Sequence, residues 1–592
     1  MVTQITWNLN TLFTDPADPK IEQTIQEITQ TADAFEKKYR NNISTLSATN
    51  LQQCIHEIEI FETKYSDLAL FANLTFSADM TQPQAQTLHD RINKLDTKIS
   101  KQLAFYAIEL GKLVETKPEL IAAPSLANYK HMLERVQHRV KHQLSEVEEQ
   151  LIIEKDQFGI NAWEELQSKW LNTRMFEVTV WGEKKHLSYG EANGLLSHPD
   201  RATRKSAHQT IYQLLGKDGE IFSAALRAIC NDWVVTSKHR NYTSPMEASL
   251  MSNDTEQPII ERLLTTIDEN TPTYRRYLKT KAKLMGMAVI GNHDIVAPLP
   301  DTPEQKFTYE QAQTIITQAY SHFNSAYAEA VREMFSQQHI DASPRFGKRN
   351  GAFCASHYNG KSAFILQSFN GTLSDVFTLA HELGHATHDW YMSRTQTLLN
   401  TNVPSIVAET ASIFGELLLT DWMLQGAKSD AERKALLCLV LDEAGMTTFQ
   451  VTARVWFEQA LYASIEKGEF LDYSTICRHW IDARNRIYGD AVTWLPEMEA
   501  EWTMKPHYYM ANYRFYNYPY VYAQMFVYSL YERYREEGET FVPKLIGLLS
   551  AGSSKSPRAL AEIVELDLTA NDFWKGGMKV YERLLTDLEK IT

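Results

Sequence analysis

One short run of residues can do metal chemistry: residues 381–385 read His-Glu-Leu-Gly-His. On a helix, His381 and His385 point from the same face, one turn apart, so both can bind one zinc ion. Glu382 then lies beside the metal without having to bind it. From there it can deprotonate a zinc-bound water and later protonate a leaving amine. The run therefore predicts metal-assisted hydrolysis with Glu382 as the base.

A catalytic zinc site needs a third protein ligand and one open position. One known spacing places a third histidine six residues after the second, but that position is Tyr391 in this sequence. A second helix is predicted to begin at Pro404, with apolar residues at helical spacing. We predict that Glu409 on this helix is the third ligand of one Zn²⁺ per chain, supported by Ser412 or Glu416.

The elements around this run must hold its side chains in place. Apolar residues three and four apart predict a helix, with Ser374 as its N-cap and Asp375 in its first turn. His388, one turn further, is predicted to support the site or the fold. Residues 364–369 are typical of a strand, and an extended substrate can add to a strand edge through main-chain hydrogen bonds. A buried structural strand fits these residues equally well.

A second informative stretch lies near the C-terminus, where His507 is followed by a tyrosine-rich segment that includes Tyr516 and Tyr520. A zinc hydrolase needs a donor that stabilises the oxyanion of the tetrahedral intermediate, and a tyrosine hydroxyl or a histidine can provide it. Tyr516 and Tyr520 share one face if they are helical, although Pro519 requires a helix start or a kink. The alternative interpretation is a set of core and rim aromatics.

Residues 369–385 resemble the oligoendopeptidase F group within the thimet-oligopeptidase-like family of zinc peptidases. Residues 408–412 together with Glu416, and residues 7–13 at the start of the chain, are similar to further segments of that family. Nearly the whole chain is covered. The resemblance implies a zinc peptidase with the metal ligands and the base named above.

The segment from His507 to Tyr520 resembles the C-terminal substrate-binding region of the same family. This resemblance implies that His507, Tyr516 and Tyr520 bind substrate or stabilise the oxyanion, without indicating which of them does so. Thimet oligopeptidase itself has a further tyrosine where this sequence has Ala523, and its spacing from histidine to tyrosine is shorter.

The resemblance implies a mostly α-helical, zincin-type fold, an ellipsoid around a deep substrate channel with a small β-sheet beside the zinc helix. Helical periodicity agrees over residues 21–39, 50–76 and 83–113, and long helices are expected to continue through residues 120–154. The family suggests three regions: an N-terminal helical cap region (1–115), an oligopeptidase F-type N-terminal subdomain (116–195) and a zinc metallopeptidase catalytic domain (196–592).

Two further local predictions concern the middle of the chain. Residues 176–185 alternate and then turn at a glycine, which predicts a β-hairpin. Residues 291–303 contain three prolines and are typical of a connection, so we expect His293 to lie in a surface loop.

Composition limits the class of protein. The 592 residues are 44% hydrophobic and 22% charged, as in a soluble globular protein. A net charge of −15 argues against nucleic acid as a partner. Five widely spaced cysteines suggest no disulfide framework. With no secretory leader and no apolar run long enough to span a bilayer, we expect a cytoplasmic protein without a membrane partner.

The predicted function is a zinc-dependent endopeptidase that hydrolyses internal bonds of short oligopeptides in intracellular peptide degradation. Two alternatives stay open. A carboxypeptidase or other exopeptidase on the same scaffold needs a cationic anchor for the terminal carboxylate of its substrate, and none is evident in the sequence. A non-catalytic, zinc-containing peptide-binding protein has no use for a base at Glu382. The sequence does not determine the oligomeric state.

Overall fold

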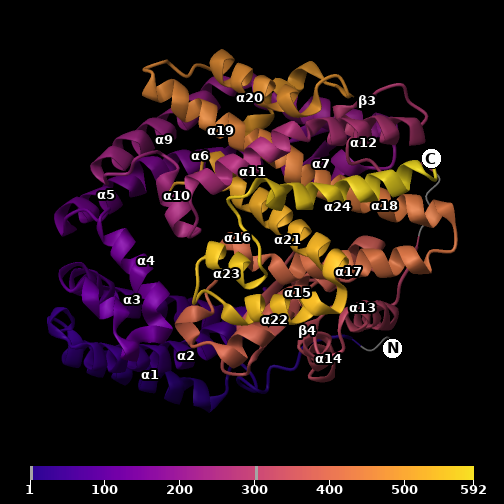
Figure 1. Ribbon diagram of the computed structural model, residues 1–592. Helices are drawn as coiled ribbons and strands as arrows, with labels where there is room; N and C mark the ends of the chain where they lie inside the picture. The colour runs from indigo at the N-terminus through magenta and orange to yellow at the C-terminus, as the bar shows by residue number, and fades with distance from the viewer. Residues whose placement is uncertain (1–3, 301–304) are drawn as a thin grey trace. The chain divides into compact units, whose positions relative to one another are not determined.

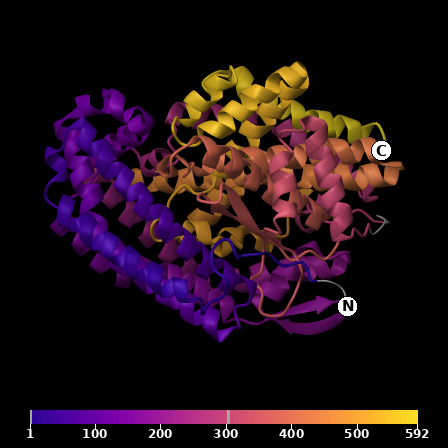
Figure 2. The same ribbon diagram turned by 90° about the horizontal axis from the view of Figure 1, so that it is seen from below.

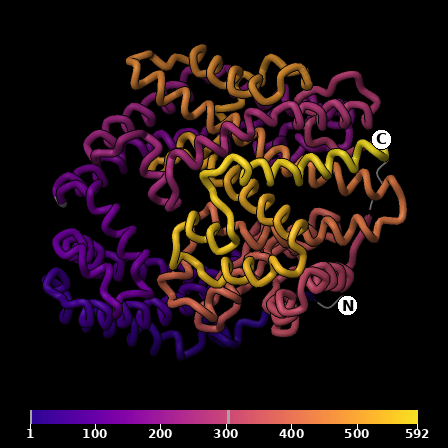
Figure 3. The backbone as a smooth tube through the Cα atoms, in the orientation of Figure 1, coloured from indigo at the N-terminus to yellow at the C-terminus, as the bar shows by residue number. Residues whose placement is uncertain are grey.

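The computed structural model describes residues 4–300 and 305–592 of the chain (Figure 1). Helices make up 71% of it and the sheets are small, so the prediction of a mostly α-helical fold with a small sheet is confirmed. The backbone trace shows rods of helix joined by short turns (Figure 3). The expected ellipsoid with a deep channel stays a prediction. In the described part of the chain, no helix is both long and apolar enough to cross a membrane.

Contacts divide the chain into two compact units, and neither unit is continuous in sequence. Unit 1 consists of Met1–Lys141, Glu304–Met423 and Arg533–Asp567, and unit 2 consists of His142–Pro303, Leu424–Glu532 and Leu568–Thr592. The three consecutive regions expected from the family stay a prediction.

Unit 1 begins with long helices that pack on one another: α1 (Pro19–Tyr39), α2 (Ala48–Ala78) and α3 (Pro83–Thr116). They lie side by side as indigo and violet rods in Figure 2. Their apolar faces form one core that includes Phe35 and Phe61. The predictions for residues 21–39, 50–76 and 83–113 are therefore confirmed.

The prediction of long helices through residues 120–154 is wrong in its first part. Pro118 and Pro124 each begin a short 3₁₀ helix, because proline lacks the N–H that would continue an α-helix. The chain then forms α4 (Lys130–Val140). A new helix, α5 (Glu146–Phe158), begins in unit 2 where Ser145 provides a capping box.

A three-stranded sheet lies in unit 1, in the order β4 (Ile340–Asp341), β6 (Ser362–Leu366), β5 (Phe353–His357). β6 pairs in parallel with β4 and antiparallel with β5. Every residue of β6 is buried, so the strand predicted at residues 364–369 is the central, structural strand and ends at Leu366. The two edge strands are β4 and β5.

The helix that carries the His-Glu-Leu-Gly-His run is α15 (Leu373–Thr395), which packs against β5 and β6. Its N-cap is Thr372 and not Ser374. The Asp375 backbone N–H donates to the Thr372 hydroxyl at 3.1 Å, and the Thr372 backbone N–H donates to the Asp375 carboxylate at 2.9 Å. Threonine and aspartate three residues apart make a capping box, which fixes the start of the helix two residues earlier than predicted.

Unit 1 contains further helices. The ones that lie wholly or mostly in this unit are α13 (Tyr309–Phe323), α14 (Glu329–Ser336), α16 (Ser405–Ala408), α17 (Thr410–Gly426), α22 (Val542–Ala551) and α23 (Pro557–Ile563).

Unit 2 is also mostly helical, and the predicted hairpin within it is confirmed as β1 (Phe176–Val180) paired with β2 (Glu183–Leu187). A second small sheet pairs β3 (Ile290–Gly291) with β7 (Val492–Thr493). Its other helices are α6 (Ile160–Asn172), α7 (Tyr189–Gly194), α8 (Arg201–Lys217), α9 (Gly219–His239), α10 (Glu247–Ser252), α11 (Gln257–Glu269), α12 (Thr271–Leu284), α18 (Asp430–Gly445), α19 (Val451–Glu466), α20 (Tyr473–Tyr488), most of α21 (Tyr518–Glu537) and α24 (Asn571–Glu589).

The prediction that His293 lies in a surface loop is wrong, because its side chain is only 5% exposed. The neighbouring Asp294 is fully buried and pairs with Arg204 at 2.9 Å and with Arg201 at 2.8 Å. A buried carboxylate is retained where cations pair with it, so this ion cluster holds the segment inside unit 2.

A buried ion cluster also holds the turn before β5. Asp341 is 1% exposed, and its carboxylate accepts hydrogen bonds of 2.7 Å from both Arg345 and Lys348. The Lys348 ammonium also donates to the Gln367 carbonyl at 2.5 Å. One lysine therefore ties the turn to the ends of β4 and β6.

Replacing Lys348 with methionine is expected to lower the free energy of unfolding by about 3 kcal/mol, because it leaves buried acceptors without their donor. Urea denaturation of the wild-type and variant proteins would measure the loss in the free energy of unfolding. Lys94→Met is the matched control, since Lys94 forms only an exposed pair with Asp90. Equal losses in the two variants would contradict a structural role for the cluster.

Candidate metal centre and active site

Three side chains in unit 1 bring their donor atoms to one point. His381 and His385 lie one turn apart on α15, and Glu409 lies at the break between α16 and α17. The Nε2 atoms of the two histidines are 3.2 Å apart, and each is 3.3 Å from the same Glu409 carboxylate oxygen. Two imidazoles and one carboxylate form the donor set of catalytic zinc sites, so these residues fit one Zn²⁺.

Two further side chains contact two of the three donors, His381 and Glu409. His381 Nδ1–H donates a hydrogen bond to Glu416 at 2.5 Å. The lone pair of Nε2 therefore stays available to bind a metal ion. The Ser412 hydroxyl donates to the Glu409 carboxylate at 2.7 Å. Both residues proposed from the sequence as supporting groups therefore contact the donor set, each through a different ligand.

The histidine and carboxylate side chains of this cluster shift one another's pKa values when no metal is bound. Burial opposes the imidazolium of His381, but the hydrogen bond and charge of Glu416 outweigh it and raise the pKa of His381 to about 9. Burial also opposes ionisation of Glu409, but the hydrogen bond and charge of His385 outweigh it and lower the pKa of Glu409 to about 2. The carboxylates thus hold positive charge at this point, as a cation site requires.

Glu382 is 7% exposed and lies on the same turn of α15 without belonging to the donor set. Burial raises the pKa of its carboxyl group. A carboxyl group beside a metal site, with its pKa raised, can accept a proton and later return it.

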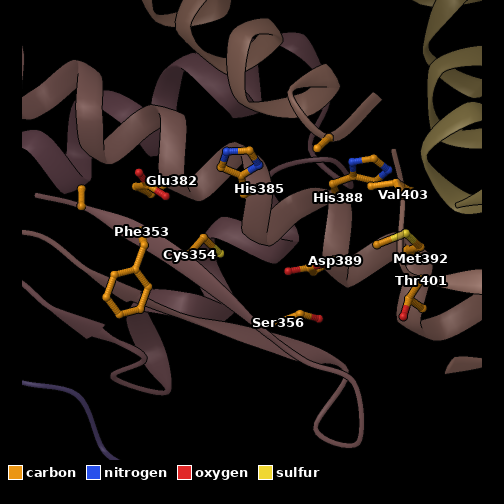
Figure 4. Close-up of a pocket in the computed structure, with 12 residues that line it drawn as sticks. Phe353, Cys354, Ser356, Glu382, His385, His388, Asp389, Met392, Thr401 and Val403 are labelled. Carbon is orange, nitrogen blue, oxygen red and sulfur yellow. The ribbon is translucent and has the colours of Figure 1, made fainter. Parts of the chain in front are cut away.

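A pocket of about 420 Å³ lies beside Glu382 and His385, entirely within unit 1 (Figure 4). Its walls come from the edge strand β5, from α15, and from the segment that leads to Glu409. The lining residues are Ala352, Phe353, Cys354, Ser356, Glu382, His385, His388, Asp389, Met392, Thr401, Val403 and Ala408. Glu382, His385 and residues of β5 therefore face the same space.

The close approach of the two ligand-bearing segments depends on Gly384. A Cβ atom at this position would lie 2.4 Å from the Ala411 carbonyl oxygen and 2.4 Å from the Ser412 Cα atom. These are backbone atoms, which cannot rotate away. A glycine between the two histidines therefore lets Glu409 reach them.

His388 is buried and does not belong to the donor set. Burial lowers the pKa of its imidazole to about 4, so the ring is neutral. It lines the pocket, so it can support the site without binding the metal.

The three C-terminal candidates lie together in unit 2. The His507 ring centroid is 5.0 Å from that of Tyr516 and 6.2 Å from that of Tyr520. Helix α21 begins at Tyr518 beside Pro519, so Tyr516 precedes the helix and Tyr520 lies in its first turn. Burial lowers the pKa of His507, while Tyr520 is 40% exposed. The structure thus brings these rings together, and their action on the metal site in unit 1 stays a prediction.

The sequence analysis missed Asp389, which lines the pocket. A signal was available, because Glu382, His385 and Asp389 are spaced three and four residues apart and so share one face of α15.

Residues 194–580 match Peptidase family M3, and residues 109–171 match Oligopeptidase F. The first match covers more than half of the chain, so the protein belongs to peptidase family M3 and is a peptidase. The resemblance drawn from the zinc motif is thereby confirmed.

Two curated relatives match almost end to end. The chain is 25% identical to Oligopeptidase PepF of Bacillus subtilis, over 99% of this chain and 87% of the relative. It is 26% identical to Group B oligopeptidase PepB of Streptococcus agalactiae, over 99% of this chain and 96% of the relative.

Solved structures share the fold. A structure from Chlamydophila abortus matches with a TM-score of 0.88 at 21% identity, over 100% of this chain and 98% of that one. Oligoendopeptidase-F from Enterococcus faecium matches with a TM-score of 0.69 at 21% identity, over 97% and 98%.

Proposed function

We propose that this peptidase is a zinc-dependent endopeptidase that cleaves internal bonds of short oligopeptides. One observation carries the proposal: Glu382 and His385, one member of the His-His-Glu donor set, line a pocket whose walls include the strand β5. These are the parts that hydrolysis of an extended peptide needs, namely a metal site, a base and a surface that holds the main chain.

His381, His385 and Glu409 would hold the ion. A bound zinc ion would polarise the substrate carbonyl and lower the pKa of its own water ligand towards neutrality. Glu382 accepts the proton of the attacking water on its carboxylate and passes it to the nitrogen of the departing amine. No side chain forms a covalent acyl intermediate in this scheme.

The edge strand β5 is the proposed docking element for the substrate. In the sheet, β5 pairs with β6 on one side only, so the main-chain groups on the other side of β5 can bind an extended peptide. Main-chain hydrogen bonds hold a peptide with little regard to its sequence, which suits an enzyme that degrades many oligopeptides.

The oxyanion donor is proposed to come from His507, Tyr516 or Tyr520. Support comes from their clustering in unit 2 and from the donor chemistry of the phenol and the imidazole. We also propose a cytoplasmic location, which is consistent with free cysteines at all five positions.

The test is a quenched fluorescent peptide blocked at both ends, incubated with the purified protein, with product masses measured. Internal cleavage that stops with o-phenanthroline and returns with zinc is the expected result. Trimming of free-ended peptides alone would replace the proposal with an exopeptidase. Binding without any cleavage would replace it with a zinc-containing peptide-binding protein.

Replacing Glu416 with glutamine is expected to weaken zinc binding by roughly 10–100-fold, because the His381 ring loses the carboxylate that orients it. Competition with a chromophoric chelator measures the affinity. Glu329→Gln on α14 is the matched control, since Glu329 pairs with Arg332 at the surface. An unchanged affinity in Glu416→Gln would contradict the supporting role.

A further inference from the structure

Asp389 is a carboxylate in the active-site pocket that the proposed chemistry does not use. It lies one turn beyond His385 on α15 and points into the pocket (Figure 4). Its carboxylate accepts a hydrogen bond from the hydroxyl of Ser356 on the edge strand β5. Among the described residues, no lysine or arginine forms an ion pair with it.

The rest of the pocket lining favours a cation with an apolar stem. Within the part of the chain that the structure describes, the lining contains two carboxylates, Glu382 and Asp389, and no lysine or arginine. Phe353, Met392 and Val403 supply apolar surface. Lysine and arginine side chains bury their methylene stems along such surface while their charged ends reach a polar partner.

The size and position of the pocket fit a side chain close to the scissile bond. A volume of about 420 Å³ accommodates one long side chain. Asp389 lies four residues after His385, which corresponds to about 6 Å along a helix. An extended peptide advances about 3.3 Å per residue, so a substrate residue within two positions of the scissile bond reaches Asp389.

We propose that Asp389 is a specificity-determining residue that selects peptides with lysine or arginine within two residues of the cleaved bond. The proposal rests on the endopeptidase function proposed above. The ammonium or guanidinium group pairs with the Asp389 carboxylate, and the stem of the side chain lies along the apolar part of the pocket lining. Burial raises the pKa of Asp389 to about 7, and a bound cation would keep its carboxylate ionised.

The activity test uses end-blocked peptides that differ at one position beside the cleaved bond: lysine, norleucine or glutamate. Norleucine keeps the stem of lysine and removes its charge. We expect the wild-type kcat/KM to be at least tenfold higher for lysine than for norleucine, and lower still for glutamate. In Asp389→Asn the ratio of lysine to norleucine is expected to fall by tenfold or more.

Two variants control this result. Asp90→Asn removes an exposed carboxylate from α3 of the same unit and is expected to leave the ratio unchanged. Asp389→Glu keeps the charge and is expected to retain a preference for lysine. A purely structural role for Asp389 would lower both rates together and leave the ratio as it is. A wild-type protein that does not prefer lysine, or an unchanged ratio in Asp389→Asn, overturns the proposal.

A binding experiment separates this proposal from the proposed function. In the Glu382→Gln background, fluorescence anisotropy measures affinity for the same labelled peptides without turnover. Tighter binding of the lysine peptide, lost on adding Asp389→Asn, supports the proposal even if the wild-type protein hydrolyses nothing. A free amino terminus offers the same ammonium chemistry. If only unblocked peptides gain affinity from Asp389, the pocket binds the amino terminus of the peptide, and the assignment of Asp389 to a lysine or arginine side chain is wrong.

Discussion

Replacing Glu382 with glutamine is expected to lower peptide turnover by roughly 10²–10⁴-fold while zinc stays bound. Glutamine has nearly the shape of glutamate, so it fits the same buried position on α15. Its neutral amide cannot take the proton of the attacking water or deliver it to the amine. Turnover of an end-blocked peptide and zinc content by atomic absorption, both on the same preparation, measure the two effects.

The metal content decides how this result is interpreted. Glu382 does not belong to the donor set formed by His381, His385 and Glu409. Glu409→Gln is therefore the comparison variant, because it is expected to lose both zinc and activity. Loss of zinc from Glu382→Gln, or turnover within tenfold of wild type, would contradict its assignment as the base.

Replacing Gly384 with alanine is expected to weaken zinc binding by roughly 10–100-fold, which corresponds to the 1–3 kcal/mol typical of overpacking. The added methyl group would meet backbone atoms of Ala411 and Ser412 at 2.4 Å. Those residues lie two and three positions after Glu409, so relief of the clash moves the third donor away from the two histidines.

Gly426→Ala is the matched control for this variant. Gly426 ends α17, and a Cβ atom there would meet nothing within 4 Å. Competition with a chromophoric chelator compares the zinc affinities, and circular dichroism verifies that both variants remain helical. An affinity of Gly384→Ala equal to that of Gly426→Ala would show that the close approach does not position Glu409.

The grouping of the three predicted metal donors could be anticipated from the sequence because a helix repeats every 3.6 residues. His381 and His385 needed only that period, and Glu409 needed a second helix start marked by Pro404. The short contact at Gly384 could not be predicted, because it depends on how two segments pack and not on either segment alone.

Other features were set by tertiary contacts that a linear pattern does not contain. His293 follows a glycine and an asparagine and precedes three prolines, which is typical of a surface loop. Its burial follows from Asp294 pairing with Arg204, about ninety residues earlier in the chain. The strand at residues 364–369 was compatible with an edge or a buried position, and the pairing of β4 and β5 on its two sides decided the question.

The free edge of β5 also constrains the shape of a substrate in solution. A peptide that pairs with a strand edge must itself be extended, because helical main-chain groups are already hydrogen-bonded to one another. A peptide that folds into a helix must therefore unfold before it docks, and the cost of that unfolding reduces its apparent affinity. Among peptides of equal length and composition, the proposed enzyme would thus discriminate by conformational freedom as well as by sequence.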